Sequence, residues 1–152
     1  MELKSEALIE KETNIRNYFA SRLNEFRPGE KVVRREQTYT DFAVRADLRT
    51  VDFENVIREW EFKIRADYSA IGQILTYSAL AKLEFNFKRT VQSVIAAFEF
   101  PEQIRLAIEV NNLGIEMVKL PDWIINAGFV PTVTAFNDHV QIPVQSIELE
   151  KE

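Results

Sequence analysis

Three residues in the first half of the chain, Asp47, Glu61 and Lys63, have side chains that could together carry out metal-assisted chemistry. Glu61 and Lys63 stand two apart in the segment from Val56 to Ile64, where apolar and polar residues alternate. A period of two predicts a β-strand from which Glu61 and Lys63 project side by side on one face.

Asp47 lies in the preceding segment, residues 42–48, which also alternates. The alternation places Asp47 on the face opposite to the apolar side chains of that segment. The stretch Thr50–Asn55 is short enough to turn the chain back as a hairpin. Antiparallel pairing of the two strands would then bring the carboxylate of Asp47 close to that of Glu61.

Two carboxylates and one ammonium in the same place suit the hydrolysis of a phosphodiester. Carboxylate oxygens are the ligands that Mg²⁺ and Mn²⁺ prefer, and a bound metal ion activates or positions water. A nearby lysine stabilises the negative charge that develops on a phosphate under attack. The alternative without a catalytic role is a salt bridge between Glu61 and Lys63 that stabilises the fold by at most about 1 kcal/mol.

A helix is predicted after the second strand, from a cap at Ser69 to about Glu84. Its apolar stripe consists of Ile71, Ile74, Leu75, Ala79, Leu80, Ala81 and Leu83. Gln73 and Tyr77 stand four apart on one face of this helix. Because a helix N-terminus favours anions, Gln73 could orient toward a phosphate, while Tyr77 could bind the same phosphate or pack in the core.

An amphipathic helix is also predicted at the start of the chain, from Ser5 as its cap to Phe26. Glu12 falls inside the apolar stripe of this helix, between Leu8 and Ile15. A carboxylate on a buried helix face is costly unless it finds a proton, a cation or hydrogen-bond donors. The alternative is that Glu12 lies at the edge of the stripe and reaches solvent.

These motifs occur in a fixed order, each in its own predicted element: Asp47 in Arg-Ala-Asp, then Glu61-Phe62-Lys63, then Gln73-x-x-x-Tyr77. In these residues the chain resembles the PD-(D/E)XK nuclease superfamily, the fold of many restriction enzymes and of the archaeal Holliday junction resolvases. Ala46 stands where the proline of that superfamily's name would be.

The resemblance implies a role for each matching residue. The implied catalytic residues are Asp47, Glu61, Lys63, Gln73, Glu12 and Tyr77, and the implied ligands of Mg²⁺ or Mn²⁺ are Asp47, Glu61, the Phe62 backbone carbonyl and Glu12. Glu12 enters because the first helix of the superfamily often supplies an acidic residue, and Glu10 is the fallback for it.

The remaining elements complete the order α-β-β-β-α-β-α-β, which is that of the resembled fold. Lys31–Tyr39 is predicted as an edge strand with little apolar content, and Arg89–Phe100 as a strand covered on both faces. Pro101 opens a helix that ends before Gly114, and Ile115–Leu120 follows as a strand. A strand, helix and strand of these lengths predict a parallel portion of the sheet. The fold class is therefore α/β, a restriction-endonuclease-like αβββαβ core with a mixed sheet flanked by helices.

A chain of 152 residues with 46% hydrophobic content predicts a single domain over residues 1–152, with its core at about 5–120. Residues 121–152 are expected to add a helical turn and two strands, 130–136 and 140–149. That apolar hairpin is a candidate edge for a homodimer. His139 is the only histidine, so a zinc site is not expected.

The formal net charge of −5 argues against a nucleic-acid partner at first sight. Lys119 and Lys151 are the only basic residues after Arg105, however, so the excess of negative charge lies in the last part of the chain. The absence of cysteine fits an intracellular, cytoplasmic location. No apolar run approaches the roughly twenty residues that a membrane span requires.

The first functional hypothesis is a Mg²⁺-dependent deoxyribonuclease, an endonuclease or resolvase-like enzyme that acts on DNA. The second keeps the nuclease fold without strong catalysis and makes the chain a module for nucleic-acid binding or protein assembly. The third is an α/β interaction domain in which Glu61 and Lys63 are only salt-bridge partners.

Overall fold

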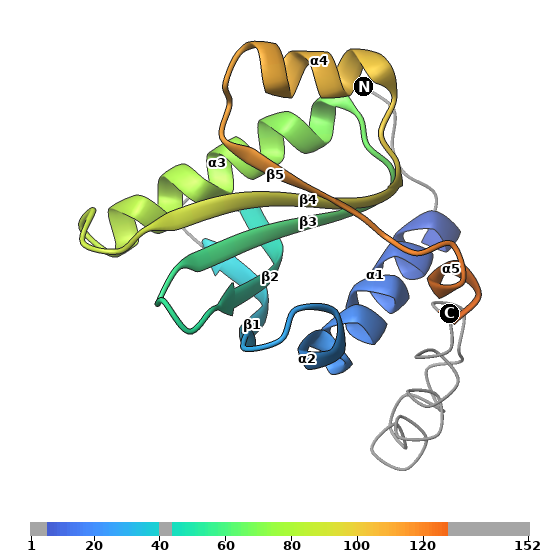
Figure 1. Ribbon diagram of the computed structural model, residues 1–152, viewed down its shortest axis with the longest axis horizontal. Helices are drawn as coiled ribbons and strands as arrows, with labels where there is room; N and C mark the ends of the chain where they lie inside the picture. The colour runs from blue at the N-terminus through green and yellow to red at the C-terminus, as the bar shows by residue number, and fades with distance from the viewer. Residues whose placement is uncertain (1–5, 40–43, 128–152) are drawn as a thin grey trace.

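The computed structural model describes residues 6–39 and 44–127 (Figure 1). Its elements in chain order are α1 (Glu6–Ser21), α2 (Leu23–Phe26), β1 (Lys31–Tyr39), β2 (Val44–Val51), β3 (Ile57–Arg65), α3 (Tyr68–Glu84), β4 (Val91–Glu99), α4 (Glu102–Val110), β5 (Ile115–Lys119) and α5 (Ile124–Ala127). The expected order of helices and strands is confirmed, with the short helix α2 added to it and α5 in the segment where a helical turn was expected.

The five strands form one mixed sheet in the order β1-β2-β3-β4-β5. β1 with β2 and β2 with β3 are antiparallel, whereas β3 with β4 and β4 with β5 are parallel. The parallel portion was expected, since each parallel pair is joined through a helix. Figure 1 shows α3 and α4 over one face of this sheet and α1 on the other, so the predicted α/β class is confirmed.

One apolar cluster on each face holds the helices to the sheet. The cluster on the α1 side contains Phe19, Trp60 and Phe62, all at most 1% exposed. The cluster on the side of α3 and α4 contains Ile74, Ile104 and other small or branched residues. β4 contributes to both clusters, as expected of a strand that is covered on both faces.

The predicted helix over residues 5–26 is broken at Arg22. The Arg22 backbone N–H donates to the Phe19 carbonyl at 3.1 Å, which is a tighter turn than an α-helix makes. The break keeps Phe26 on the core, where its ring stacks on that of Phe19 with centroids 4.7 Å apart. The predicted cap at Ser5 lies outside the described residues.

α3 begins earlier than predicted, and of its predicted apolar stripe Ile74 and Ala81 are buried whereas Leu75 and Leu83 are not. Asp67, rather than Ser69, caps it, because the Asp67 carboxylate accepts the Ala70 N–H at 2.8 Å. Its buried residues are Ala70, Ile74, Tyr77, Ser78 and Ala81. Leu75 and Leu83 are 36% and 56% exposed, so the predicted stripe through them is wrong. Small alanines face the sheet, which lets the helix lie close to it.

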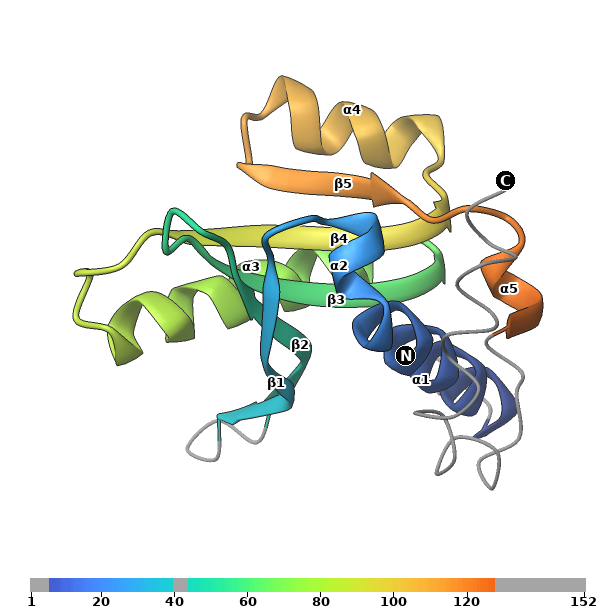
Figure 2. The ribbon, with the colours of Figure 1, turned by 60° about the horizontal axis from the view of Figure 1, so that its bottom comes forward.

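β1 is the expected exposed edge strand, with residues 31–36 all open to solvent. Figure 2 shows β1 and β2 as a hairpin that leaves the plane of β3, β4 and β5. The predicted strands at 130–136 and 140–149, the dimer edge and His139 lie outside the described residues. Among the described helices, none has the length and apolar content needed to cross a bilayer.

Candidate active site

The candidate site lies where β2 separates from β3. Leu48 and Trp60 form the last pair of the β2–β3 ladder. Beyond that pair, Asp47 Oδ2 accepts a hydrogen bond from the backbone N–H of Phe62 at 2.8 Å. The carboxylate takes the donor that a β2 carbonyl would take in a continuing ladder. It therefore lies against the main chain of β3 between Glu61 and Lys63.

The separation of the strands corrects one detail of the predicted alternation. The apolar residues of segment 42–48 were expected to share one face, but Ala46 belongs to the cluster on the α3 side and Leu48 to the cluster on the α1 side. Once β2 no longer pairs with β3, its side chains need not follow the faces of β3.

Glu12 brings a second carboxylate to the same edge of β3. It is 8% exposed on α1, and its Oε2 accepts the backbone N–H of Ile64 at 3.2 Å. The N–H groups of Phe62 and Ile64 point to the same edge because they are two residues apart in a strand. Glu10 is exposed. Of the two α1 residues considered, Glu12 is therefore the one that reaches the strand carrying Glu61 and Lys63.

Glu61 and Lys63 lie side by side, as the strand period predicted, and both are buried. Their exposures are 5% and 3%, and Lys63 Nζ lies 3.8 Å from Glu61 Oε2. Their partners on β4 are Ile95 and Ala97, which belong to the cluster on the α3 side. The pair therefore faces α3 from the middle of the sheet.

Arg16 is a charged residue of the site that sequence reasoning missed. Its side chain is 5% exposed, donates to the Asp47 carbonyl oxygen at 3.3 Å and forms an ion pair with Glu36 at 3.4 Å. Arg16 stands one helical turn after Glu12, and that spacing was the available signal. It fixes the main chain of Asp47 from the side of α1.

Gln73 and Tyr77 lie on α3, on the side of the sheet that Glu61 and Lys63 face. Tyr77 is 6% exposed within the apolar cluster on that side, so it packs in the core. Gln73 is half-buried, and its Oε1 accepts no hydrogen bond from the described residues. A buried amide oxygen is costly without a donor, which a bound water or ligand could supply.

Glu59 stands two residues before Glu61 on the same face of β3 and is buried. It is 0% exposed, and Arg49 Nε lies 2.5 Å from its Oε2. Arg49 also binds Glu84 at the end of α3, with Nη2 2.9 Å from Oε1. The hydrogen bond from Arg49 is the main cause that lowers the pKa of Glu84. This cluster ties α3 to β2 and β3 beside Glu61.

The oxygen atoms of these residues are of the kind that suits a hard cation. Asp47, Glu61 and the Phe62 carbonyl offer only oxygen, and Mg²⁺ is held in many proteins by one or two carboxylates together with water. Within residues 6–39 and 44–127, no three His, Cys, Asp or Glu side chains converge as a ready-made metal cage.

The fold and the site define a class of protein: an α/β domain in which a mixed five-stranded sheet carries acidic residues and a lysine near the point where an antiparallel strand separates from it. Solved structures of the same fold include "crystal structure of a repair endonuclease from Pyrococcus abyssi", with a TM-score of 0.58, 25% identity, and coverage of 79% of this chain and 48% of that one. EndoMS in complex with dsDNA gives a TM-score of 0.60 at 20% identity, covering 80% of this chain and 49% of that one. EndoMS in its apo form gives 0.55 at 22% identity, covering 79% and 48%.

The chain spans about half the length of these structural neighbours. The similarity shows a fold shared with a repair endonuclease and with EndoMS. No model of a protein family matches the chain, and no curated protein matches it significantly.

Proposed function

We propose that this chain is a metal-dependent nuclease domain of the PD-(D/E)XK type that hydrolyses phosphodiester bonds of DNA as an endonuclease. The observation that carries the proposal is the Asp47 carboxylate on the Phe62 N–H, at 2.8 Å, between Glu61 and Lys63. Support also comes from the fold that the chain shares with a repair endonuclease and with EndoMS, which was solved in complex with dsDNA.

Each residue of the site has a role in this proposal. Asp47, Glu61 and the Phe62 carbonyl would hold Mg²⁺ or Mn²⁺, and Glu12 would add a further carboxylate. The bound metal supplies Lewis-acid activation of water. Lys63 would stabilise charge on the attacked phosphate. The remaining polar residues would position this group, Arg16 through the Asp47 main chain and Gln73 through its amide.

A second function, a nuclease-fold module that binds nucleic acid or assembles with proteins, is favoured by the burial of Lys63. Its side chain is 3% exposed, and its Nζ lies 3.8 Å from Glu61 Oε2. A lysine in that position is a good ion-pair partner even where no phosphate reaches it.

Cleavage assays separate the two functions. Labelled duplex, flap, junction and single-stranded DNA are incubated with the protein in Mg²⁺, in Mn²⁺ and in EDTA. The proposal predicts cleavage that requires the metal and falls by about a hundredfold or more in Lys63→Ala and Asp47→Asn, because one electrostatic group at a reacting phosphate is worth that much.

Lys82→Ala and Glu54→Gln are the matched controls, since both residues are exposed and lie outside the site. Cleavage that survives in Lys63→Ala would assign the activity to another site. DNA binding without cleavage in any metal would favour the module.

A further inference from the structure

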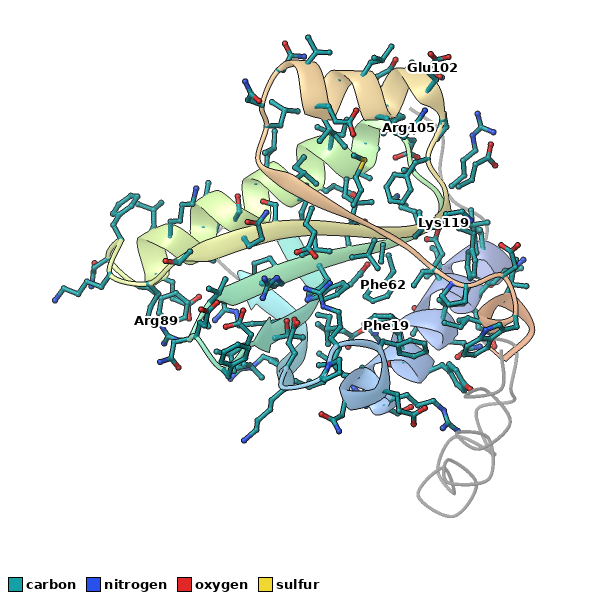
Figure 3. The ribbon with its side chains drawn as sticks, in the orientation of Figure 1. Phe19, Phe62, Arg89, Glu102, Arg105 and Lys119 are labelled. Atoms are coloured by element: carbon teal, nitrogen blue, oxygen red, sulfur yellow. The ribbon has the colours of Figure 1, made fainter. Side chains whose placement is uncertain are left out.

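A hollow of about 490 Å³ opens at the carboxyl ends of β4 and β5, beside α4. Its lining residues are Phe98, Glu99, Phe100, Arg105, Met117 and Lys119. Figure 3 shows Arg105 and Lys119 toward one end of the molecule and Arg89 at the opposite end. In open α/β sheets, ligands bind outside the carboxyl ends of the parallel strands. The hollow therefore lies where this fold class places ligands.

The hollow lies close to the candidate active site. Lys63, Ala97 and Lys119 are successive partners across β3, β4 and β5. Because neighbouring strands are about 4.8 Å apart, the main chains of Lys63 and Lys119 are roughly 10 Å apart. That distance corresponds to about three nucleotides along one strand of DNA, at about 3.4 Å each.

The charges around the hollow leave one cation without an internal partner. Glu99 pairs with Arg65 at 2.8 Å, and Lys119 Nζ lies 3.8 Å from Asp122 while donating to the Phe98 carbonyl at 2.9 Å. Arg105 is exposed, and no described residue forms an ion pair or a hydrogen bond with its guanidinium. A guanidinium presents a fork of donors that matches a phosphate.

The lining combines that guanidinium with apolar surface. Phe100 and Met117 are half-buried and belong to the edge of the cluster on the α3 side. Aromatic and thioether side chains pack against the planar face of a base or against a sugar. A ligand with one phosphate and one flat, largely apolar body satisfies both parts of the lining.

We propose that this hollow binds one nucleotide of the DNA substrate close to the cleaved bond, with its phosphate at Arg105 and Lys119 and its sugar or base on Phe100 and Met117. The proposal rests on the proposed nuclease function, because it assumes that DNA passes along this edge of the sheet. It assigns to Arg105 a role in substrate binding and none in the chemical step.

The chain has only two methionines, Met1 and Met117, so ¹³C-methyl methionine labelling gives two NMR signals. Met117→Leu assigns them. The protein is titrated with 5′-phosphorylated pentathymidylate in the presence of EDTA, which prevents cleavage. The titration should shift the Met117 signal in a saturable way. Thymidine alone and inorganic phosphate alone should each shift it less at equal concentration.

The double variant Arg105→Ala/Lys119→Ala should weaken this titration by at least about tenfold, because it removes both phosphate contacts. The control Lys88→Ala/Arg89→Ala removes the same charges at the other end of β4 and should change it by less than about twofold. Equal weakening by both double variants would reveal a general charge effect and overturn the proposal. An unmoved Met117 signal, with binding of the oligonucleotide seen by fluorescence anisotropy, would also overturn it.

The two proposals fail separately. Metal-dependent cleavage that requires Lys63, together with an unmoved Met117 signal, overturns the nucleotide site alone. If the Met117 signal shifts saturably and the shift depends on Arg105, but the protein cleaves no DNA, the nucleotide site is supported and the proposed nuclease function is ruled out.

Discussion

At the scale of single residues, two carboxylates are positioned by the backbone of β3. Asp47 accepts the Phe62 N–H and Glu12 accepts the Ile64 N–H, at 2.8 and 3.2 Å. Hydrogen bonds from N–H groups to ionised carboxylates are stronger than neutral ones. Each carboxylate is therefore held in place before any metal or substrate arrives.

Glu12→Gln tests whether Glu12 is a metal ligand or only a partner of the Ile64 N–H. Glutamine keeps the acceptor oxygen and the size, so the fold should persist, while the lost charge should weaken Mn²⁺ binding by about tenfold or more. Isothermal titration with Mn²⁺ measures the change. Glu10→Gln, on the exposed side of α1, is the control and should bind Mn²⁺ as the unaltered protein does. Equal affinities in all three proteins would make Glu12 structural.

Sequence reasoning reached Glu12 but not Arg16. The sequence showed a charged Glu12 inside an apolar stripe, which is costly without a partner. The backbone N–H of Ile64 supplies that partner. Arg16 has a long side chain that could equally have reached solvent from its position. Only the approach of β2 to α1, which no local pattern encodes, gives it the Asp47 carbonyl as acceptor.

At the scale of elements, Arg49 connects β2 to both β3 and α3. It binds Glu59, which is 0% exposed, and Glu84 near the last turn of α3. A buried carboxylate that loses its cation is strongly destabilising. The Arg49 guanidinium therefore helps the apolar cluster on this face to hold α3 over Glu61 and Lys63.

Arg49→Ala should lower the free energy of unfolding by about 3–5 kcal/mol, because it removes the cation that is ion-paired with the fully buried Glu59. The double variant Arg49→Met/Glu59→Leu should recover most of that loss, since both charges are then gone. Urea denaturation followed by circular dichroism measures both. A double variant no more stable than Arg49→Ala would show that packing around Arg49, and not the stranded charge, sets the cost.

The packing face of α3 shows what the sequence could not determine. Its leucines made a stripe at helical spacing, yet Leu75 and Leu83 are exposed and the alanines at 70 and 81 are fully buried. Hydrophobicity alone ranks leucine above alanine for the core. The close approach of the helix to the sheet selects the small residues, and that distance is a property of the whole fold.

At the scale of the whole molecule, a network of ion pairs joins the loop after α2 to β3 and β5. Arg58 binds Asp52 at 2.7 Å and Glu116 at 3.1 Å, and Arg27 binds Glu116 at 2.8 Å. The hydrogen bond from Arg58 lowers the pKa of Asp52. Burial alone would raise the pKa of Glu116, but hydrogen bonds from Arg27 and Arg58 outweigh it and leave that pKa lowered.

These lowered pKa values predict loss of stability in acid. A carboxyl whose pKa is lower in the folded state contributes stability that is complete above its unfolded pKa and disappears as the pH falls through the folded value. Unfolded values of 3.8 for Asp52 and 4.5 for Glu84 and Glu116 place the loss below about pH 5. Urea midpoints measured from pH 7 down to pH 3 should show it.

Arg58→Met provides the comparison for the acid range. It removes a partner of two of the three carboxyls, so its stability should depend less steeply on pH below about pH 5. An identical slope in Arg58→Met and the unaltered protein would mean that other groups govern the acid transition.

The order of elements and the mixed sheet could be predicted because they follow from periodicity and connection length. The strand Lys31–Tyr39 was predicted with its observed bounds, and the parallel pairing of β4 with β5 was predicted from the helix between them. The point where β2 separates from β3 could not be predicted. At that point the Asp47 side chain, and not a β2 carbonyl, accepts the hydrogen bond from β3. The alternation of apolar and polar residues continues through that point, so the sequence pattern gives no sign of the separation.

The central claim is that Asp47 and Glu61 share one metal ion beside Lys63. Diffraction from a crystal of this protein soaked in Mn²⁺, measured at the manganese edge, tests it most directly. The account predicts one anomalous peak about 2.2 Å from oxygens of Asp47, Glu61 and the Phe62 carbonyl, lost in Glu61→Gln. A fully soaked crystal with no peak between those two carboxylates, or with its peak elsewhere, would contradict the account.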